Sequence, residues 1–405
     1  MVIKKKYIQF TVIVAFILYG LNSIFFEKKL LFNEMLSFVG ILLFIRFVVR
    51  KNYVLSIPKS SVFKVITYFW LLCIIHLIVS LFLKTNWYFY LRNTVIFYAS
   101  FTFLIGFYWY NSFKEFLHKA RHILLLVVVA LFPTGTKYYL DRFSLSVFFP
   151  LLLKKDNSFI PLILLLLNFI YAVVFASMTV AILGSILFVL ITIRHYAYLR
   201  LLFSTSLVVF IAFFIYLAPS LQLYKIGDRS YKLFGNVERV YTDNDLLRID
   251  ENSSWRTILW YRITVEKFPK NLAGIGFGTP LIVYTKGRNT AVSNYDDEHD
   301  AHVTGVHNTY LTLFGRLGIG YLLIIYTIYT IVFKEFYAYK KYYIAEGGYL
   351  FFLSFFSISI IGLFNLVLES PIYASLYWVF LGLVARAIYN RPLNENTLTS
   401  SQVSS

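Results

Sequence analysis

The stretch YLTLFGRLGIGYLLIIYTIYTIVF, residues 310–333, decides the fold of this protein because it contains a single charged residue, Arg316. About 20 consecutive apolar residues are enough for a helix to cross the hydrocarbon core of a bilayer. The whole chain has the same character, since 59% of its 405 residues are hydrophobic and 14% are charged. A soluble domain carries about 25% charged residues. The composition therefore predicts a polytopic membrane protein.

Further apolar runs of comparable character are separated by polar segments along the chain. They cover residues 7–25, 30–49, 64–83, 93–110, 122–136, 143–153, 159–175, 178–193, 201–218, 349–368 and 372–388. The runs 122–136 and 143–153 are short and contain Pro133 and Pro150, so broken or tilted helices are expected there. The pattern predicts an all-α fold of about twelve transmembrane helices, with one large loop domain between the ninth and the tenth.

Four regions follow from this pattern. Residues 1–218 form an N-terminal bundle of about nine spans, and residues 219–306 form the large loop. Residues 307–390 contain about three more spans. The tail 391–405 has too little apolar content to pack, so it is predicted to be disordered.

The distribution of charge predicts how the chain is oriented in the membrane. The net charge is +18, and Lys4, Lys5 and Lys6 precede the first apolar run, which we expect to be a retained helix. With the N-terminus in the cytoplasm, the cytoplasmic segments are rich in Lys and Arg, whereas loop 219–306 has eleven basic and eleven acidic residues. Positive charge of this kind reports orientation and not a nucleic-acid partner. Both termini are predicted to be cytoplasmic and the loop external.

Two features of the external loop precede its return to the membrane. SSWRTILWYRITVEKFP (253–269) has a helical pattern in which Arg256 and Arg262 flank an apolar face. NLAGIGFGTP (271–280) follows a helix rather than a strand, so its glycines are not a dinucleotide fingerprint. We interpret it as a tight turn whose backbone approaches either a ligand or another chain segment.

The stretch YDDEHDAHVTGVHNTYL (295–311) is the most polar entry into a span. His299 and His302 with the surrounding acids are suitable ligands for a divalent metal, but a solvated acidic loop is the preferred interpretation. His307 lies at the external start of a span, with Gly305 before it and Asn308 after it. From position alone, His307 is either a reactive base or a residue that only caps a helix.

Three elements carry a resemblance to a known family. GVHNTYLTLFGRLGIGYLL (305–323) resembles the His-Asn signature and glycine-rich span entry of the O-antigen ligase and polymerase superfamily. SSWRTILW with FPKNLAGIGFG resembles the family's external arginine helix and Gly-x-Gly turn, and DRFSLSVFFPLLL (141–153) resembles the region before its loop. The resemblance covers about residues 140–390. One departure is Ser177-Met178-Thr179, where many members carry Ser-Arg. The role of that arginine is then either absent here or supplied by another external arginine, for which Arg142, Arg229 and Arg239 are the candidates.

The resemblance implies an enzyme of the bacterial inner membrane that acts on surface polysaccharide. Its donor would be an undecaprenyl-diphosphate-linked glycan, and its acceptor lipid A-core or a growing glycan chain. No metal and no cofactor would be needed, because arginines grip the diphosphate and a histidine serves as the base. The residues implied are His307 as catalytic base, Arg256, Arg262, Arg316 and Arg142 for the donor diphosphate, and Asn308, Gly318 and Glu369 in support.

Other functions remain open. A repeat-unit polymerase differs from a ligase mainly in its acceptor. A polysaccharide transporter or flippase is the rival from another class, although several spans contain no ionisable residue of the kind that coupled transporters bury. A metal-dependent external hydrolase built on DDEHDAH (296–302) is a third possibility.

Overall fold

The computed structural model describes residues 32–50, 60–83, 86–116, 222–226, 229–232, 260, 263, 272–283, 302–303, 305–363 and 366–392. The predicted spans at 7–25 and between 122 and 218 lie outside these residues, as do most of the tail and most of the external loop. Arg142, Arg256, Arg262 and His299 also lie outside them. The predictions for these residues and spans stay predictions.

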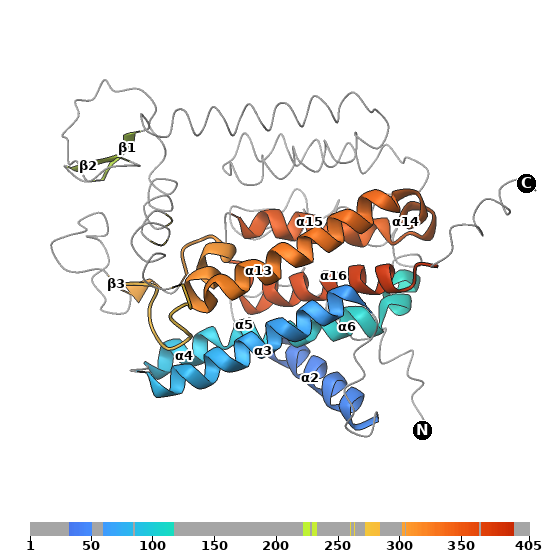
Figure 1. Ribbon diagram of the computed structural model, residues 1–405, viewed down its shortest axis with the longest axis horizontal. Coiled ribbons are helices and arrows are strands. Elements are labelled where there is room, and N and C mark those ends of the chain that lie inside the picture. Colours follow the sequence, from blue (N-terminus) through green and yellow to red (C-terminus); the bar gives the residue numbers. More distant parts are fainter. Residues whose placement is uncertain are drawn as a thin grey trace, which may run out of the picture.

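The described part of the chain is predominantly helical, as predicted (Figure 1). The helices are α2 (Phe32–Arg50), α3 (Ser61–Phe82), α4 (Trp87–Asn93), α5 (Val95–Tyr98), the 3-10 helix η1 (Ala99–Thr102), α6 (Phe103–Tyr108), α13 (Thr309–Ala338), α14 (Lys340–Glu346), α15 (Tyr349–Gly362) and α16 (Pro371–Tyr389). Two antiparallel ribbons pair β1 (Gln222–Ile226) with β2 (Arg229–Lys232) and β3 (Ile282–Val283) with β4 (His302–Val303). All four strands belong to the predicted external loop.

Helices that could span a membrane lie where the apolar runs predict them. Among the described residues, α3 and α13 are long and apolar enough to cross a membrane. A third span results if α14 and α15, which meet at a bend of 109°, are counted together. The apolar part of α16, Tyr373–Tyr389, is shorter. The protein is therefore a helical protein with candidate membrane spans, and twelve spans remain an expectation.

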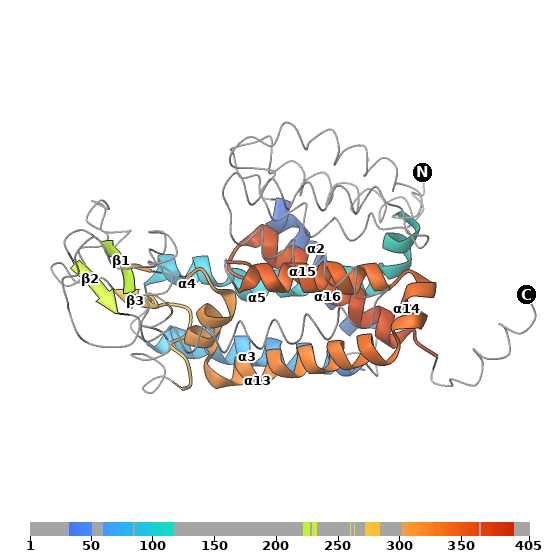
Figure 2. The same ribbon diagram turned by 90° about the horizontal axis from the view of Figure 1, so that it is seen from above.

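The helices pack as a bundle in which α3 lies along α13, and α16 lies between α6 and α15 (Figures 1 and 2). Glycines allow the closest approach. A Cβ atom at Gly106 would collide with the backbone of Val379, and one at Gly382 with the backbone of Phe103. Small residues at such crossings let membrane helices approach closely, so that van der Waals packing holds them together.

The run 93–110 is not one regular helix, which corrects the prediction of a single span there. It contains the end of α4, then α5, η1 and α6 in succession. Side-chain hydroxyls compete with the helix hydrogen bonds at these junctions. Thr94 Oγ1 donates to the carbonyl of Leu91, Ser100 Oγ to that of Phe97 and Thr102 Oγ1 to that of Ala99. Such local bonds favour 3-10 turns and bends.

The run 310–333 is also broken, although it was predicted as one span. Gly318 has φ 69° and ψ −160°, which is not helical. The hydroxyls of Tyr310 and Tyr329 lie 2.5 Å apart, whereas 19 residues of straight helix would separate their Cα atoms by about 28 Å. The first part of α13, up to Leu317, therefore folds back on the second. The second part, Ile319–Ala338, is about 30 Å long and can span the membrane alone.

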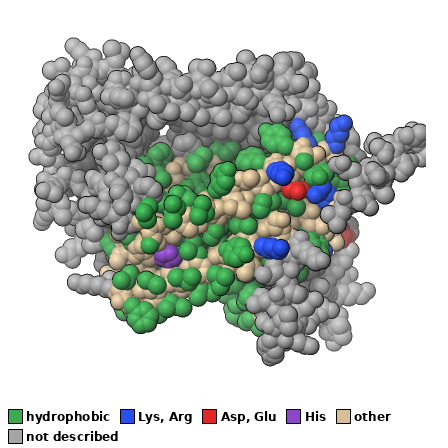
Figure 3. Space-filling model, in the orientation of Figure 1, with side chains coloured by type: hydrophobic (Ala, Val, Ile, Leu, Met, Phe, Trp, Pro, Cys, Tyr) green, Lys and Arg blue, Asp and Glu red, His purple; other side chains and the backbone are tan. Residues whose placement is uncertain are grey.

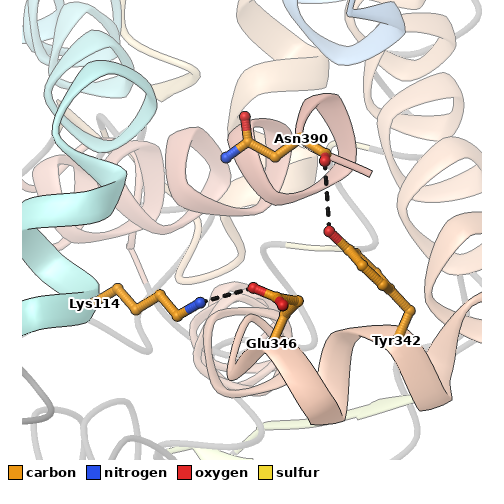
Figure 4. A network of polar contacts seen from close by, with 4 residues as sticks. All are labelled: Lys114, Tyr342, Glu346 and Asn390. Carbon is orange, nitrogen blue, oxygen red and sulfur yellow. Dashed lines mark hydrogen bonds and ion pairs between the residues drawn. The ribbon is translucent and has the colours of Figure 1, made fainter. Parts of the chain in front are cut away.

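Charged side chains gather at one end of the bundle, near α14 (Figure 3). Lys114 Nζ lies 2.8 Å from Glu346 Oε2, and the Tyr342 hydroxyl donates to the carbonyl of Asn390 at 3.4 Å (Figure 4). The guanidinium of Arg391 lies 3.5 Å from the centre of the Tyr339 ring. These contacts join the α14 region to the segment that follows α16 and to Lys114.

Candidate functional site

The glycine-rich loop 272–280 docks on the break in α13. Three backbone hydrogen bonds join them: Ile275 N to Gly315 O at 3.0 Å, Gly276 N to Arg316 O at 2.9 Å, and Ile319 N to Leu272 O at 2.9 Å. In an unbroken helix these backbone groups of α13 would bond within the helix. The loop replaces the bonds that Gly318 removes, as a broken membrane helix requires. The tight turn predicted at 271–280 therefore approaches another chain segment.

The other side of the loop is held by α3 and α4. Ser80 Oγ accepts a hydrogen bond from Phe277 N at 2.9 Å and donates to the carbonyl of His76. Asn93 Nδ2 donates to the carbonyl of Phe277, also at 2.9 Å. Asn86 N donates to the carbonyl of Gly278 at 3.0 Å. The loop therefore lies between the break in α13, the last turn of α3 and both ends of α4.

Arg316 is fully buried beneath this loop. Its Nη1 donates to the carbonyl oxygens of Gly276 and Thr279, at 3.2 Å each. Burying a guanidinium is costly unless its hydrogen bonds are made inside the protein. In the structure the side chain holds the loop, and its role in binding the donor diphosphate stays a prediction.

His307 lies two residues before α13, in a backbone conformation that is rare for residues other than glycine. Its φ is 50°, and the side chain is half-buried. Val306, before it, is anchored twice: its N–H donates to Thr312 Oγ1 at 3.1 Å, and its carbonyl accepts from Trp260 Nε1 at 2.7 Å. A left-handed residue costs about 1–3 kcal/mol and persists where its surroundings determine it, often at functional sites.

Asn308 is the N-cap of α13. Its Oδ1 accepts a hydrogen bond from Leu311 N at 3.0 Å, and its carbonyl accepts one from Thr312 N at 2.9 Å. A capping asparagine contributes about 1 kcal/mol to a helix. The capping role considered for His307 therefore belongs to Asn308, and His307 is held from both sides by fixed neighbours.

Thr309 connects this helix start to the turn between α15 and α16. Its hydroxyl donates to Glu369 Oε2 and accepts from the N–H groups of Val367 at 2.7 Å and Leu368 at 3.1 Å. Thr309 is 1% exposed, so these bonds are shielded from solvent. The hydrogen bonds of Thr309 thus hold residues 366–370 against the start of α13. Glu369 therefore lies near His307 and Asn308.

The electrostatics around Glu369 follow from its burial. Desolvation raises the pKa of the Glu369 carboxyl above its ordinary value. The hydroxyls of Thr309 and Thr312 and the positive charge of Arg316 oppose that rise. The start of α13 also carries the positive end of the helix dipole, which favours a nearby carboxylate. Glu369 is therefore a carboxyl that takes up a proton more readily than one in water.

Arg92 is a cation near this region that the sequence analysis did not single out. It is exposed, lies in the last turn of α4 and is close enough to Arg316 to act on it electrostatically. Arg92 therefore adds positive charge beside Arg316, which also interacts electrostatically with Glu369. The only sequence signal was the short segment WYFYLRN (87–93), which precedes an apolar run and resembles the basic end of many spans.

The site is recessed within the bundle. A Cβ at Gly320, two residues after the break, would touch the side chain of Leu72, and Tyr321 packs on Phe69. Leu72 precedes the C-terminal end of α3, Phe82, by ten residues, or about 15 Å of helix. The break in α13 therefore lies alongside α3, short of its C-terminal end, and loop 272–280 packs on it.

Most of the acidic stretch 295–302 is outside the described residues. In the ranges that the structure describes, no group of three or more His, Cys, Asp or Glu side chains could hold a metal ion. Of the predicted metal-ligand candidates, His302 lies in β4, and His299 with its acidic neighbours is outside the described residues. The metal alternative therefore remains open.

No protein-family model, curated protein or solved structure matches this chain. The fold and the site define only a class: a helical protein with candidate membrane spans, one of them broken, whose break is closed by a glycine loop from the region 219–306.

Proposed function

We propose that the protein is a metal-independent glycosyltransferase of the bacterial inner membrane. It transfers a glycan from an undecaprenyl-diphosphate carrier to an acceptor hydroxyl on the external face, as an O-antigen ligase does with lipid A-core. The observation that carries this proposal is the position of His307, which has a rare backbone conformation between two anchored residues and lies close to the Thr309–Glu369 hydrogen bond.

In this proposal His307 takes the proton of the acceptor hydroxyl as the hydroxyl oxygen attacks the anomeric carbon. The bond from that carbon to the diphosphate oxygen breaks, and the carrier diphosphate leaves. A histidine side chain titrates near neutral pH and contributes about 10²–10⁴ in rate as a general base. Fixing its backbone reduces the reorganisation needed for the reaction.

The cationic residues supply charge for the departing diphosphate. Arg256, Arg262 and Arg142 keep this role from the family resemblance, since they lie outside the described residues. Arg316 supports the site through loop 272–280, and the exposed side chain of Arg92 adds positive charge next to it. Asn308 and Gly318 support it by starting α13 and by breaking it.

A repeat-unit polymerase is the alternative within the same class. It would use the same donor and the same base, with a second carrier-linked glycan as acceptor. The geometry around His307 and Glu369 serves both reactions equally, because both attack through a sugar hydroxyl.

A transporter of polysaccharide is the second candidate, favoured by a specific observation. α13 is broken inside the bundle, and Arg316 beside the break is fully buried. Transporters bind substrates at broken helices and bury ionisable groups near them. This observation makes a direct assay of transfer against transport necessary.

Purified protein in liposomes, supplied with a carrier-linked glycan and an acceptor lipid, provides that assay. Formation of glycosylated acceptor with release of carrier diphosphate, unchanged by EDTA, supports the glycosyltransferase. Movement of intact donor to the other leaflet without product supports the transporter. Metal-dependent release of free glycan to water, stopped by EDTA and restored by a divalent metal, would instead support the hydrolase reading of residues 296–302.

Orientation is a further part of the proposal, with loop 219–306 external and both termini cytoplasmic. The natural cysteine, Cys73, is buried. A membrane-impermeant thiol reagent added from outside should therefore label a variant Ser293→Cys and leave Ser401→Cys unlabelled. The reverse pattern would place His307 on the cytoplasmic side and remove the proposed function.

A further inference from the structure

Four polar atoms lie buried next to the candidate site without a hydrogen-bond partner among the described residues. They are the Tyr321 hydroxyl, Trp378 Nε1, Ser375 Oγ and Glu369 Oε1. Tyr321, Trp378 and Ser375 are each at most 1% exposed. Most buried polar atoms in proteins bond to protein or to ordered water. Four such atoms in one region therefore need a common explanation.

These side chains converge between α3, α13 and α16. The Phe69 ring contacts both the Trp378 ring, at 4.9 Å between centroids, and the Tyr321 ring, at 6.4 Å. Ser375 precedes Trp378 by three residues, which places both on one face of α16. Glu369 is close enough to act electrostatically on the Tyr321 hydroxyl.

A chain of tyrosine hydroxyls continues from this region. The Tyr310 hydroxyl lies 2.5 Å from that of Tyr329 and donates to the carbonyl of Ser359 at 2.7 Å. The Tyr329 hydroxyl lies 3.4 Å from that of Tyr377. Tyr321 interacts electrostatically with all three of these tyrosines. A polar core therefore runs through a part of the bundle that is otherwise apolar.

We propose that this region is a binding site for internal water, which bridges Glu369 Oε1 and the Tyr321 hydroxyl and links Glu369 to the hydroxyls of Tyr310, Tyr329 and Tyr377. Buried waters typically make two to four hydrogen bonds to polar groups that lack other partners. Tyr321, Trp378, Ser375 and Glu369 offer donors and acceptors in the combination that such water needs. The proposal does not depend on glycan transfer.

The bound water has a consequence for the candidate site, because it gives the Glu369 carboxyl a hydrogen-bonded chain that can carry protons within the bundle. Glu369 is buried and interacts electrostatically with Arg316, which is held under loop 272–280. Water and tyrosine hydroxyls both donate and accept hydrogen bonds, so a chain of them can pass a proton in either direction. Glu369 can then share its proton with the bound water and these hydroxyls although its carboxyl is buried.

Hydroxyl-radical footprinting with brief X-ray exposure tests the site in the intact, purified protein. Radicals formed from bound water oxidise aromatic rings next to that water, even when the rings are buried. Phe352 is the control, because it is fully buried and its ring neighbours are Phe336, Tyr343 and Phe356. We expect oxidation of Tyr321 at least about 10-fold faster than that of Phe352, and a clear decrease in the Glu369→Leu variant. Equal, slow oxidation of both rings would overturn the proposal.

The direction in which the substitution Tyr321→Phe shifts the melting temperature gives a second, independent test. If the Tyr321 hydroxyl had no partner, Tyr321→Phe would remove an unsatisfied polar group and raise the melting temperature. If the hydroxyl bonds to water, the same change should lower the melting temperature by at least about 2 °C. Tyr326→Phe is the matched control, since Tyr326 lies on the same helix and is 71% exposed. An increase in Tyr321→Phe, with no change in the control, would contradict the proposal.

Discussion

Gly274 and Gly318 lie against each other in the structure, one in the glycine-rich loop and one at the break of α13. A Cβ atom on Gly274 would collide with the backbone of Arg316 and Gly318, and one on Gly318 with the backbone of Leu272 and Ala273. Both glycines have positive φ, 84° and 69°. The two segments thus fit together only because neither residue has a side chain.

Gly318→Ala should accordingly separate the loop from α13. At φ 69° and ψ −160°, a conformation essentially restricted to glycine, alanine costs about 1–3 kcal/mol, and contact with backbone atoms adds to that cost. We expect a decrease of several degrees in the melting temperature of the detergent-solubilised protein and faster proteolysis in loop 272–283. Gly320→Ala is the control, because its Cβ would meet only the flexible tip of Leu72 at 3.2 Å. Equal stability of the two variants would show that the contact between Gly274 and Gly318 is unimportant.

Thr309→Val should disconnect the turn 366–370 from the start of α13. The change keeps the shape of the side chain but removes the hydroxyl that bonds to Glu369 and to the N–H groups of Val367 and Leu368. Leaving a buried polar group unpaired costs about 1–3 kcal/mol. In thermal unfolding, the free energy of unfolding should decrease by about 1–3 kcal/mol or more for Thr309→Val. The decrease for Thr309→Ser should be much smaller. Comparable losses in both variants would point to packing instead of the hydroxyl.

The raised pKa of Glu369 predicts a pH-dependent contribution to stability. The folded protein binds the proton of this carboxyl more tightly than the unfolded chain, in which glutamate has a pKa of about 4.3. The associated stability is present below that pH and is lost as the pH rises through the folded pKa. The Glu369→Gln variant has a neutral side chain at every pH, so it keeps this contribution to stability. The melting temperature of the variant relative to wild type should therefore increase from pH 4 towards neutral pH.

Glu346→Gln serves as the control for that pH series. Glu346 pairs with Lys114 at the exposed opposite end of the bundle. Exposed ion pairs contribute little to stability, so this variant should follow wild type across the series. A constant difference between Glu369→Gln and wild type at every pH would contradict the raised pKa.

The helical elements were predictable from the sequence because their cause is local. The apolar runs 64–83, 310–333 and 372–388 correspond to α3, α13 and α16, since backbone groups in a bilayer must bond within a helix. The start of α13 was also close to its expected position, because a residue such as Asn308 caps a helix through its own side chain.

The break in α13 was not predictable from the same pattern. Gly315, Gly318 and Gly320 are equally compatible with a membrane helix, and the break falls at the one whose neighbours bond to Leu272 and Gly276. That choice depends on a loop about forty residues earlier in the chain. The contact of Thr309 with Glu369 and the proximity of Arg92 to Arg316 are likewise tertiary, so the sequence contained the residues of the site but not their arrangement.

The role of His307 can be separated from its backbone strain by comparing two variants. His307→Ala removes the imidazole and keeps a side chain at φ 50°, whereas His307→Gly removes the imidazole and relaxes the backbone. The glycine variant should therefore be more stable than the alanine variant by about 1 kcal/mol. Both should lose glycan transfer by about 10²-fold or more if the imidazole is the base. Transfer by purified protein in liposomes and thermal unfolding of the same samples measure the two effects. His302→Ala and His299→Ala, from the acidic stretch, should retain most activity. If His307→Gly transfers glycan at the wild-type rate, the left-handed residue serves the fold alone and the proposed base is wrong.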